Sequence, residues 1–370
     1  MTVETTSLLI KREPSLGLYA VSSHPLKQGD LVLEARPYGL SIIHEERKRV
    51  CHTCYTIALN KYALSCTECT SVYYCSSSCQ DLKQPHHTEF ECTAMVDLSN
   101  LGPVYRKHAK KVYTIVSKLN GMLLEDAEVY SALDIQDLGR FVLGMISRRN
   151  APDDQAGVSY KDVTKLIRNV ESLDRIERQQ LEYLYGLLKT LPHSSNNNDT
   201  PSQHFTTLLT NHYTLDDFIN LICIRTCNGF GLWSFEGTSA GFGIYPAASY
   251  FNHSCKPNLM RDTGIKLHNP SSSSDSNVTT FLDAEPRVKF FALHDMEEGA
   301  ALYHSYIDFT LPRRERQELL RDGYYFECGC ERCVNEDEGW IRTYSCPGCS
   351  SARIPGYDCG RCGARKHSEV

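Results

Sequence analysis

The sequence lacks a long apolar run. No stretch reaches the roughly 18 consecutive apolar residues that a membrane-spanning helix needs. Near the start, residues 8–10 form one short apolar group, which Lys11 and Arg12 follow directly. A secretory signal peptide has a longer apolar core and a cleavage site of small residues. These absences argue against a membrane span and a secretory signal, so we expect a cytoplasmic or nuclear protein with no membrane partner.

The chain also lacks an excess of positive charge. It has 39 Lys and Arg residues against 45 Asp and Glu residues, a formal net charge of −6. Such a chain has no general attraction for nucleic-acid phosphates. The local basic cluster of Arg313, Arg314 and Arg316 surrounds Glu315, a pattern typical of a solvated helix face rather than a nucleic-acid patch. We therefore expect no nucleic-acid partner.

What the sequence has in unusual number is cysteine, with 17 among 370 residues. A chain of this length is one large domain with insertions or a set of two or three modules. Its 41% of hydrophobic residues are enough for a sizeable core. In the cytosol or nucleus cysteines stay reduced, and closely spaced groups of them bind metal rather than each other. Metal binding is therefore the first property that the sequence predicts.

The first cysteine block holds eight candidate ligands in four close pairs. They are Cys51 and Cys54, Cys66 and Cys69, Cys75 and Cys79, and His87 and Cys92. A short Cys-x2-Cys turn places two thiolates on one ion, and a second pair completes a tetrahedral shell. The block therefore predicts two zinc ions. His86 competes with His87 for the histidine position.

Two further cysteine sets lie toward the end of the chain. Cys328, Cys330 and Cys333 supply three thiolates, and Cys255 is the candidate for the fourth. The other set has the spacing of a zinc ribbon and consists of Cys346, Cys349, Cys359 and Cys362. Together the sequence predicts sixteen ligands for about four zinc ions. Cys223 and Cys227 remain, and their apolar helical context indicates small core residues.

The remaining sequence indicates alternating helical and strand regions. Residues 17–43 predict small β-hairpins, and residues 103–192 carry leucine and valine at helical spacing. Thr214 followed by Asp217 is typical of a helix N-terminus. Strand-like pieces follow over residues 228–306, interrupted by a serine-rich stretch at 271–276 that we interpret as an enlarged loop.

Three short stretches then carry a resemblance. They are NHSCKPN at 252–258, YHSYID at 303–308 and FECGCERC at 326–333. They resemble the SET domain of lysine methyltransferases, and with GLYAV at 17–21 the match is to the SET-and-MYND family. The cysteine block resembles a MYND finger, in which pairs interleave. The resemblance implies one zinc ion on Cys51, Cys54, Cys75 and Cys79, and another on Cys66, Cys69, His87 and Cys92.

This resemblance implies an α+β fold with a β-rich SET domain split by insertions. The first part of that domain would span 1–50, the MYND finger 51–92 and a helical insertion 93–227. The C-terminal SET core would span 228–310, the post-SET zinc region 311–336 and the small zinc ribbon 337–370. Relatives often continue into a helical-repeat domain. Because only 37 residues follow Cys333, we expect a more open substrate cleft here, and a truncated natural chain is the alternative.

The resemblance also implies transfer of methyl from S-adenosylmethionine to a protein lysine. Because free lysine has a pKa near ~10.4, the site must favour the neutral amine, which a narrow aromatic channel does by desolvation. By motif match, Phe230, Tyr306 and Tyr324 would line that channel. The cofactor would contact Gly17, Asn228, Asn252, His253, Tyr306 and Phe326. We interpret His304 and Trp233 as packing or solvent-facing residues.

A second class of function competes with the enzyme. In it the chain is a weakly active or inactive scaffold, and the MYND finger recruits proline-rich partners. The preserved Tyr306, Asn252 and His253 favour the enzyme. We expect a monomer whose substrate is a histone or another protein, with a structural role for all of its zinc, since four protein ligands leave no open position for catalysis.

Overall fold

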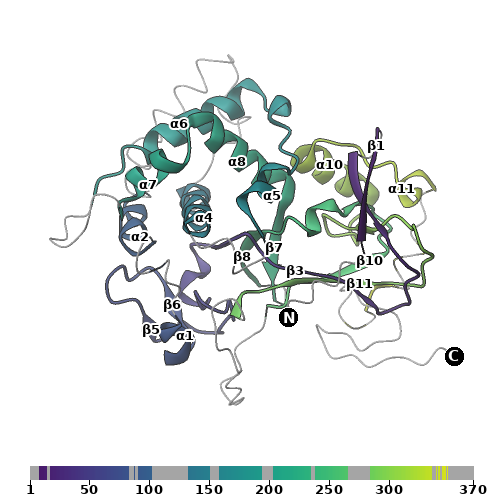
Figure 1. Ribbon diagram of the computed structural model, residues 1–370, viewed down its shortest axis with the longest axis horizontal. Coiled ribbons are helices and arrows are strands. Elements are labelled where there is room, and N and C mark those ends of the chain that lie inside the picture. Colours follow the sequence, from purple (N-terminus) through teal and green to yellow (C-terminus); the bar gives the residue numbers. More distant parts are fainter. Residues whose placement is uncertain are drawn as a thin grey trace.

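The computed structural model describes residues 8–14, 17–82, 87, 91–101, 132–150, 158–193, 203–234, 238–265 and 284–335, with 339, 341, 344–346 and 348 (Figure 1). The strands are β1 (Leu8–Glu13), β2 (Gly17–Ser22), β3 (Leu31–Ala35), β4 (Gly39–Ile42), β5 (Leu64–Ser65), β6 (Tyr73–Tyr74), β7 (Gly229–Trp233), β8 (Ser239–Ile244), β9 (Asn252–His253), β10 (Leu259–Asp262), β11 (Val288–Ala292) and β12 (Tyr303–His304).

The helices are α1 (Ser77–Asp81), α2 (Cys92–Ser99), α4 (Ala132–Arg149), α5 (Tyr160–Thr164), α6 (Arg175–Leu188), α7 (Phe205–His212), α8 (Leu215–Asn228), α10 (Arg313–Tyr324) and α11 (Glu331–Asn335). Short 3-10 turns are η1 (Glu46–Lys48), η5 (Val170–Ser172) and η7 (Ala248–Tyr250). This mixture of helix and sheet confirms the expected α+β class. None of the helices in these ranges has both the length and the apolar character that crossing a bilayer requires.

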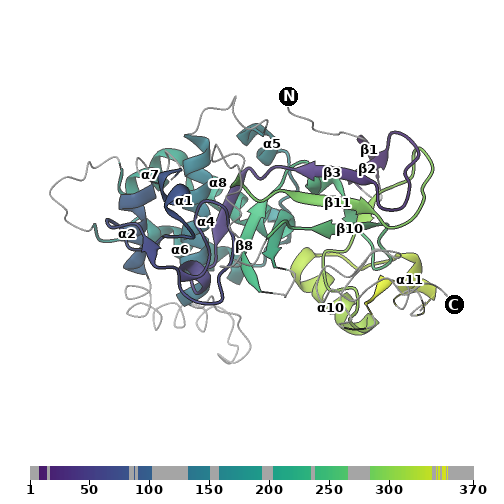
Figure 2. The same cartoon turned by 90° about the horizontal axis from the view of Figure 1, so that it is seen from below.

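Small sheets, antiparallel except for the β9–β12 pair, form one half of the molecule, and the pairings of β3 and β4 join distant parts of the chain (Figure 2). β3 pairs with β11, so that Leu33 lies opposite Phe290. β4 pairs with β8, which also pairs with β7. The expectation of hairpins within 17–43 was therefore wrong for β3 and β4. β3 and β4 pair with strands that come about 200 residues or more later in the chain, and of the strands within 17–43 only β2 is in a hairpin, with β1.

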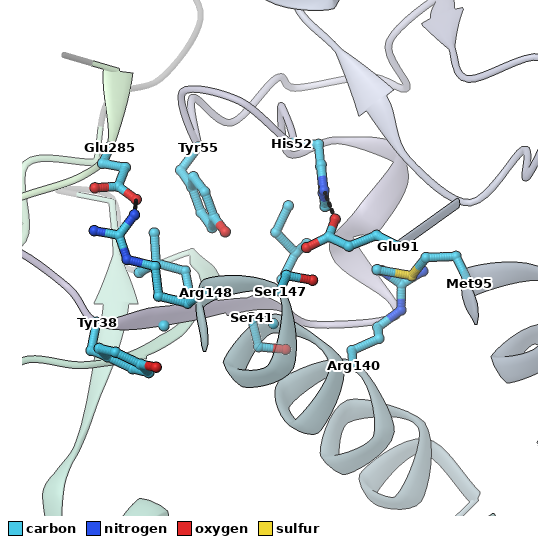
Figure 3. Close-up of a pocket in the computed structure, with 14 residues that line it drawn as sticks. Tyr38, Ser41, His52, Tyr55, Glu91, Met95, Arg140, Ser147, Arg148 and Glu285 are labelled. Atoms are coloured by element: carbon cyan, nitrogen blue, oxygen red, sulfur yellow. Dashed lines mark hydrogen bonds and ion pairs between the residues drawn. The ribbon is translucent and has the colours of Figure 1, made fainter. Parts of the chain in front are cut away.

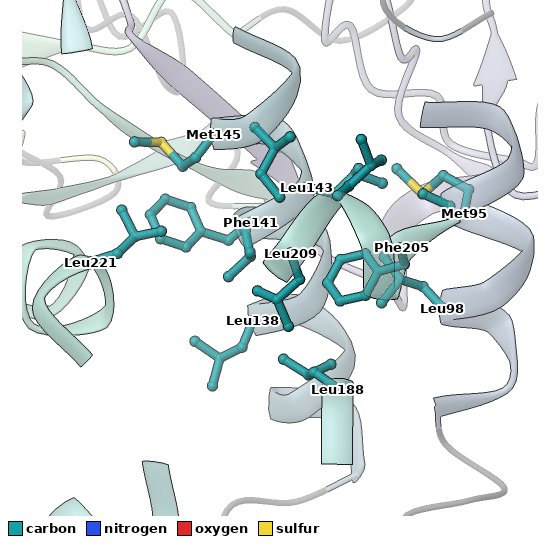
Figure 4. Packing of buried hydrophobic residues seen from close by; sticks show 14 of the residues in the cluster. Met95, Leu98, Leu138, Phe141, Leu143, Met145, Leu188, Phe205, Leu209 and Leu221 are labelled. Carbon is teal, nitrogen blue, oxygen red and sulfur yellow. The ribbon is translucent and has the colours of Figure 1, made fainter. Parts of the chain in front are cut away.

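Helices form the other half, around a single apolar core. The side chains of α4 that recur at helical spacing, Leu138, Phe141 and Met145, are at most 1% exposed (Figure 4). Around them pack Phe205 and Leu209 of α7, and α2, α6 and α8 close the cluster. α4 also packs against β4, where Met145 lies next to Gly39, and this contact joins the helical half to the sheets.

Local signals set where the helices begin. The side chain of Thr214 accepts a hydrogen bond from the backbone N–H of Asp217, and the Asp217 carboxylate accepts one from the Thr214 backbone. This capping box confirms the predicted N-terminus of α8. Asp174 caps α6 in the same way.

The predicted helical character of 103–192 holds for α4, α5 and α6, but 165–174 is not a continuous helix, because Asn169 adopts a left-handed φ of 44°. Residues 102–131, the polar run 194–199 and the serine-rich stretch 271–276 lie outside the described residues.

Gly241 in β8 tests how tightly the central sheet is packed. A Cβ atom at this position would meet the backbone carbonyl oxygen of Ser41 in β4, which cannot rotate away. We expect Gly241→Ala to lower the free energy of unfolding by about 1–3 kcal/mol, the usual cost of overpacking. In the matched control Gly186→Ala, nothing lies within 4 Å of the new methyl group in α6. That variant should gain about 0.5–1 kcal/mol in urea denaturation. Equal stability of the two variants would contradict the sheet geometry.

Candidate active site and thiol clusters

One cavity of about 250 Å³ collects side chains from six separate elements and the turns beside them. Its walls contain aromatic rings, backbone around two glycines, and a few polar groups. The described lining residues are Cys227, Asn228, Gly229, Phe230, Gly231, Trp233, Ser249, Phe251, Arg261, His304, Tyr306 and Tyr324. Phe230, Tyr306 and Tyr324, which motif matching placed in one channel, are therefore brought together in one wall.

The two tyrosines are fixed by hydrogen bonds to the backbone. The Tyr306 hydroxyl donates to the carbonyl oxygen of Phe251 at 3.0 Å, and the Tyr324 hydroxyl donates to the carbonyl oxygen of Tyr306 at 3.3 Å. Their ring centroids lie 5.0 Å apart. Burial raises the pKa of both phenols, most strongly that of Tyr306, so both stay protonated at neutral pH.

His253 connects this wall to the next group of predicted residues. Its Nδ1 accepts a hydrogen bond from the Tyr306 backbone N–H at 3.0 Å. Its ring lies 5.3 Å from that of Tyr306 and 5.9 Å from that of Phe326. Burial lowers the pKa of His253 to about 4, so the imidazole is neutral. Asn252 precedes it in β9, which pairs in parallel with β12. The structure thus brings Asn252, His253, Tyr306 and Phe326 side by side.

Asn228 and Gly17 lie at the edges of this arrangement. Asn228 ends α8 and lines the cavity, while its Nδ2 donates to the carbonyl oxygens of Ile167 and Ile224 at 2.6 and 2.9 Å. Gly17 begins β2 with a φ of +69°, the left-handed region that glycine favours, and no atom lies within 4 Å of the place where its Cβ would be. It is not among the described residues that line the cavity.

The cavity also contains three side chains that the sequence did not assign to the site. His304 is buried as interpreted, but both of its ring nitrogens lack a hydrogen-bond partner and its ring stacks on Phe230 at 5.7 Å. Trp233 is half exposed and also lines the cavity. No sequence motif indicated Arg261. In the strand LMRD it follows buried Leu259 by two residues, and that spacing places both on one face. This alternation is the signal that could have found it.

The first cysteine block forms two clusters, as the resemblance implied. In each, one ligand atom from every member lies within 4.8 Å of all the others. One group is Cys51, Cys54, Cys75 and Cys79, and the other is Cys66, Cys69, His87 and Cys92. His87 rather than His86 is in the cluster, while His86 lies outside the described residues. Four converging sulfur or nitrogen ligands fit a tetrahedral zinc ion.

Glu91 supports the second of these clusters from behind. Its buried carboxylate lies 3.6 Å from Nδ1 of His87 and 3.0 Å from Nε2 of His52. The distance to Nδ1 of His87 is that of an ion pair, and a carboxylate near the remaining ring nitrogen favours one orientation of a metal-binding histidine. This partner is not apparent in the cysteine spacing, because only the folded block brings residue 91 to residue 87.

The third cluster joins Cys255 to Cys328, Cys330 and Cys333. The Sγ atom of Cys255 lies 3.9 Å from that of Cys328 and 3.5 Å from that of Cys333. A hydrogen bond from Cys255 lowers the pKa of Cys330 far below that of an ordinary thiol. These four residues could therefore hold one zinc ion. Of the ribbon, Cys346 is described and buried, and Cys349, Cys359 and Cys362 lie outside the described residues.

The comparisons place this architecture in a known family. The family model of the SET domain matches residues 17–307, most of the chain, and the chain therefore belongs to the SET domain family. It is 27% identical over 349 residues to a SET and MYND domain-containing protein of Dictyostelium discoideum, covering 88% of this chain and 59% of that one. It is 25% identical over 324 residues to human histone-lysine N-methyltransferase SMYD3, covering 87% and 60%. The resemblance to SET-and-MYND proteins is confirmed.

The chain spans about three-fifths of the length of these two relatives. A solved structure of the SET domain of LSMT bound to lysine and AdoHcy matches 90% of this chain and 55% of that one. Its TM-score is 0.35 at 12% identity, a similarity too weak to equate individual residues.

A second, narrow cavity of about 40 Å³ lies between the cysteine block, β4 and α4 (Figure 3). Buried charges point into it. Arg140 donates to the carbonyl oxygen of Ser71 at 3.2 Å, and the guanidinium of Arg148 approaches the carboxylate of Glu285 at 3.9 Å. The cavity is too small for an organic ligand and has the polar lining that buried water needs. The residues that line this cavity connect the cysteine block to the helical half.

Metal content tests the clusters directly. We expect at least three zinc ions per folded chain from the clusters in the described ranges, and about four with the ribbon. Cys255→Ala should remove one ion, because a tetrahedral shell loses a ligand that lies far from the other three in sequence. Cys223→Ala is the matched control, since Cys223 is buried but belongs to no cluster among the described residues. Elemental analysis that finds two ions or fewer in the folded wild type would overturn the assignment.

Glu285 gives a prediction for pH. Burial raises its pKa from 4.5 to about 7. A carboxyl group with a raised pKa in the folded state favours folding when protonated, so its contribution is present below about pH 4.5 and is lost as pH rises through 7. We expect Glu285→Gln to raise the free energy of unfolding at pH 8 by up to about 3 kcal/mol, and to have little effect at pH 5.

The matched control is Glu297→Gln on the exposed turn before Gly299, which should change stability little at either pH. Urea denaturation at pH 5 and pH 8 makes the comparison. A Glu285→Gln variant that is less stable than wild type at pH 8 would show that the Arg148 ion pair outweighs the cost of burying the carboxylate.

Proposed function

We propose that the chain is a protein-lysine N-methyltransferase that uses S-adenosylmethionine. The observation that carries this proposal is the convergence of Phe230, Tyr306 and Tyr324 on one cavity, beside the ring of His253, which lies 5.3 Å from that of Tyr306. The relatives that match most of this chain include one named histone-lysine N-methyltransferase. Histones and other proteins with exposed lysines are the proposed substrates.

The cavity walls can prepare a lysine side chain for reaction. Rings surround the aliphatic stem, and desolvation among them lowers the pKa of the amine. The Tyr306 hydroxyl is aligned by the Phe251 carbonyl, so the phenol oxygen has a fixed position in the wall. Such fixed geometry lets the amine approach in line with the methyl donor. Because Tyr306 stays protonated, it adds no charge to the cavity.

The residues beside the cavity fit a cofactor with an aromatic base and polar ends. S-adenosylmethionine would supply an electrophilic methyl group when bound. His253 and Phe326 present neighbouring ring faces suited to an adenine, and Asn252 and Asn228 present amides suited to polar ends. Open space at Gly17 leaves room for close approach of the backbone. The two unpartnered nitrogens of His304 are further polar atoms that a ligand in the cavity can satisfy.

In this proposal the zinc ions are structural. Each cluster supplies four protein ligands, so no coordination position is open for substrate. We also propose the domain boundaries that the family resemblance implies. A finger at 51–92 and a helical insertion at 93–227 separate the first part of the catalytic domain, 1–50, from its core at 228–310. The post-SET region at 311–336 then closes over Tyr306.

Tyr306→Phe tests the site. We expect turnover to fall about 10- to 100-fold, equivalent to about 1.4–2.8 kcal/mol of transition-state free energy, because the variant lacks the hydroxyl that Tyr306 fixes against the Phe251 carbonyl. Cofactor affinity should change little. Tyr303→Phe is the matched control, since Tyr303 lies in β12 three residues earlier and does not line the cavity.

The measurement uses labelled S-adenosylmethionine with a core-histone mixture and a denatured proteome extract. Calorimetry measures cofactor binding separately. Unchanged turnover in Tyr306→Phe would remove this residue from the mechanism. Failure of the wild type to bind the cofactor at all would instead favour a scaffold that acts through its finger.

A further inference from the structure

Arg261 places a positive charge in the wall of the aromatic cavity. It lies in β10 opposite Phe290 of β11, and its guanidinium carbon is 5.8 Å from the ring centroid of Phe230. Within the described part of the chain it makes no hydrogen bond and no ion pair with a carboxylate. Burial lowers its pKa, yet arginine keeps its proton in proteins. Its charge is therefore not neutralised by the cavity.

The other titratable side chains around the cavity are neutral at pH 7 to 9. They come from α8, β12, α10 and the turns beside β8 and β12, and they are Cys227, His304, Tyr324, Tyr245 and Tyr306. Burial raises the pKa of the thiol to about 11, raises those of the three phenols and lowers that of the imidazole. The carboxyl group of Glu285, which affects Tyr245, faces Arg148 in the second cavity.

An aromatic cavity without this arginine would attract an ammonium ion. The faces of tyrosine and phenylalanine rings carry negative potential and bind cations. Here the guanidinium already lies over the Phe230 ring and presents a like charge to any ammonium that enters. At about 5–6 Å in a partly dry site, that repulsion is equivalent to roughly one to two pH units. The negative faces of the same rings disfavour the binding of a carboxylate, so we do not expect the cavity to bind an anion.

We propose, on the basis of the proposed function, that Arg261 is a positioning residue that admits the substrate amine to the cavity in its neutral form. The ammonium loses its proton to water before it enters, and no group in the cavity needs to accept it. A neutral amine is the nucleophile that methyl transfer requires. Arg261 would thus select the reactive form of the substrate at the point of binding.

The test measures binding of n-butylamine, a mimic of the lysine side chain, to the full zinc-loaded chain between pH 7 and pH 9.5 by NMR titration. If only the neutral amine binds, the apparent affinity of the wild type should rise about tenfold per pH unit, because free lysine-type amines titrate near ~10.4. In Arg261→Met the affinity at pH 7 should rise at least about tenfold, and the pH dependence should flatten.

Controls separate charge from shape. Pentan-1-ol, a neutral molecule of similar size, should bind wild type and Arg261→Met alike at every pH, which shows an intact cavity. Arg287→Met removes a positive charge that pairs with Glu34 outside the cavity, and it should keep the wild-type pH dependence. The pH slope of the wild type tests the proposal even if Arg261→Met does not fold.

Four outcomes would overturn the role of Arg261, and the first three concern affinity and its pH dependence. They are a wild-type affinity for n-butylamine that does not change with pH, an Arg261→Met variant with the wild-type slope, and tighter binding of butyrate than of n-butylamine at pH 9.5. Absence of n-butylamine binding at pH 9.5 also overturns it. The methyl-transfer assay with core histones decides the proposed function separately, since a chain that methylates histones without this pH dependence retains the activity and loses the inference.

Discussion

The structure depends most on the cluster that joins Cys255 to Cys328, Cys330 and Cys333. Cys255 and Cys328 are 73 residues apart, and each lies next to a wall of the cavity. The cluster packs directly against Tyr306, Tyr324 and Phe326. Because the C-terminal segment contributes little apolar surface of its own, the bonds that a metal makes to four thiolates replace a hydrophobic core there. Cavity geometry and metal binding are therefore linked.

Buried arginines make such a cluster electrostatically possible. Four thiolates around one divalent ion leave net negative charge, which is costly away from water. Arg332 is fully buried, and one of its nitrogens donates to the carbonyl oxygens of Cys255 and Phe309 at 2.9 and 2.6 Å. Arg316, equally buried, approaches the sulfur of Cys333 at 4.0 Å. These cations offset the thiolate charge and tie α10 and α11 to the cysteine motif. The residues 313–316, interpreted from sequence as a solvated face, therefore include one arginine with a structural role.

The cavity combines parts that have opposite electrostatic preferences. Its rings favour cations, and Arg261 opposes them. His304 is neutral because it is fully buried, and Arg261 lowers its pKa further. A site with this composition holds an aliphatic chain with a neutral polar end better than it holds either ion. That property depends on Arg261 of β10 together with His304 of β12, and no single sequence motif contains both.

The sequence by itself predicted which cysteines form the three described clusters, the capping of α8 and the family, because ligand spacing, caps and short motifs are local. It left the choice between His86 and His87 open. The sequence also predicted Cys255 as the fourth ligand of the third cluster, because three thiolates leave one position of a tetrahedral zinc ion unfilled. Only the tertiary structure decided how β3 and β4 pair, because strands close in sequence found better apolar partners in β11 and β8. It also decided that Glu91 supports His87 and that Arg261 and His304 share a cavity. Such contacts join residues far apart in the chain, and their chemistry arises only when folding removes water from between them.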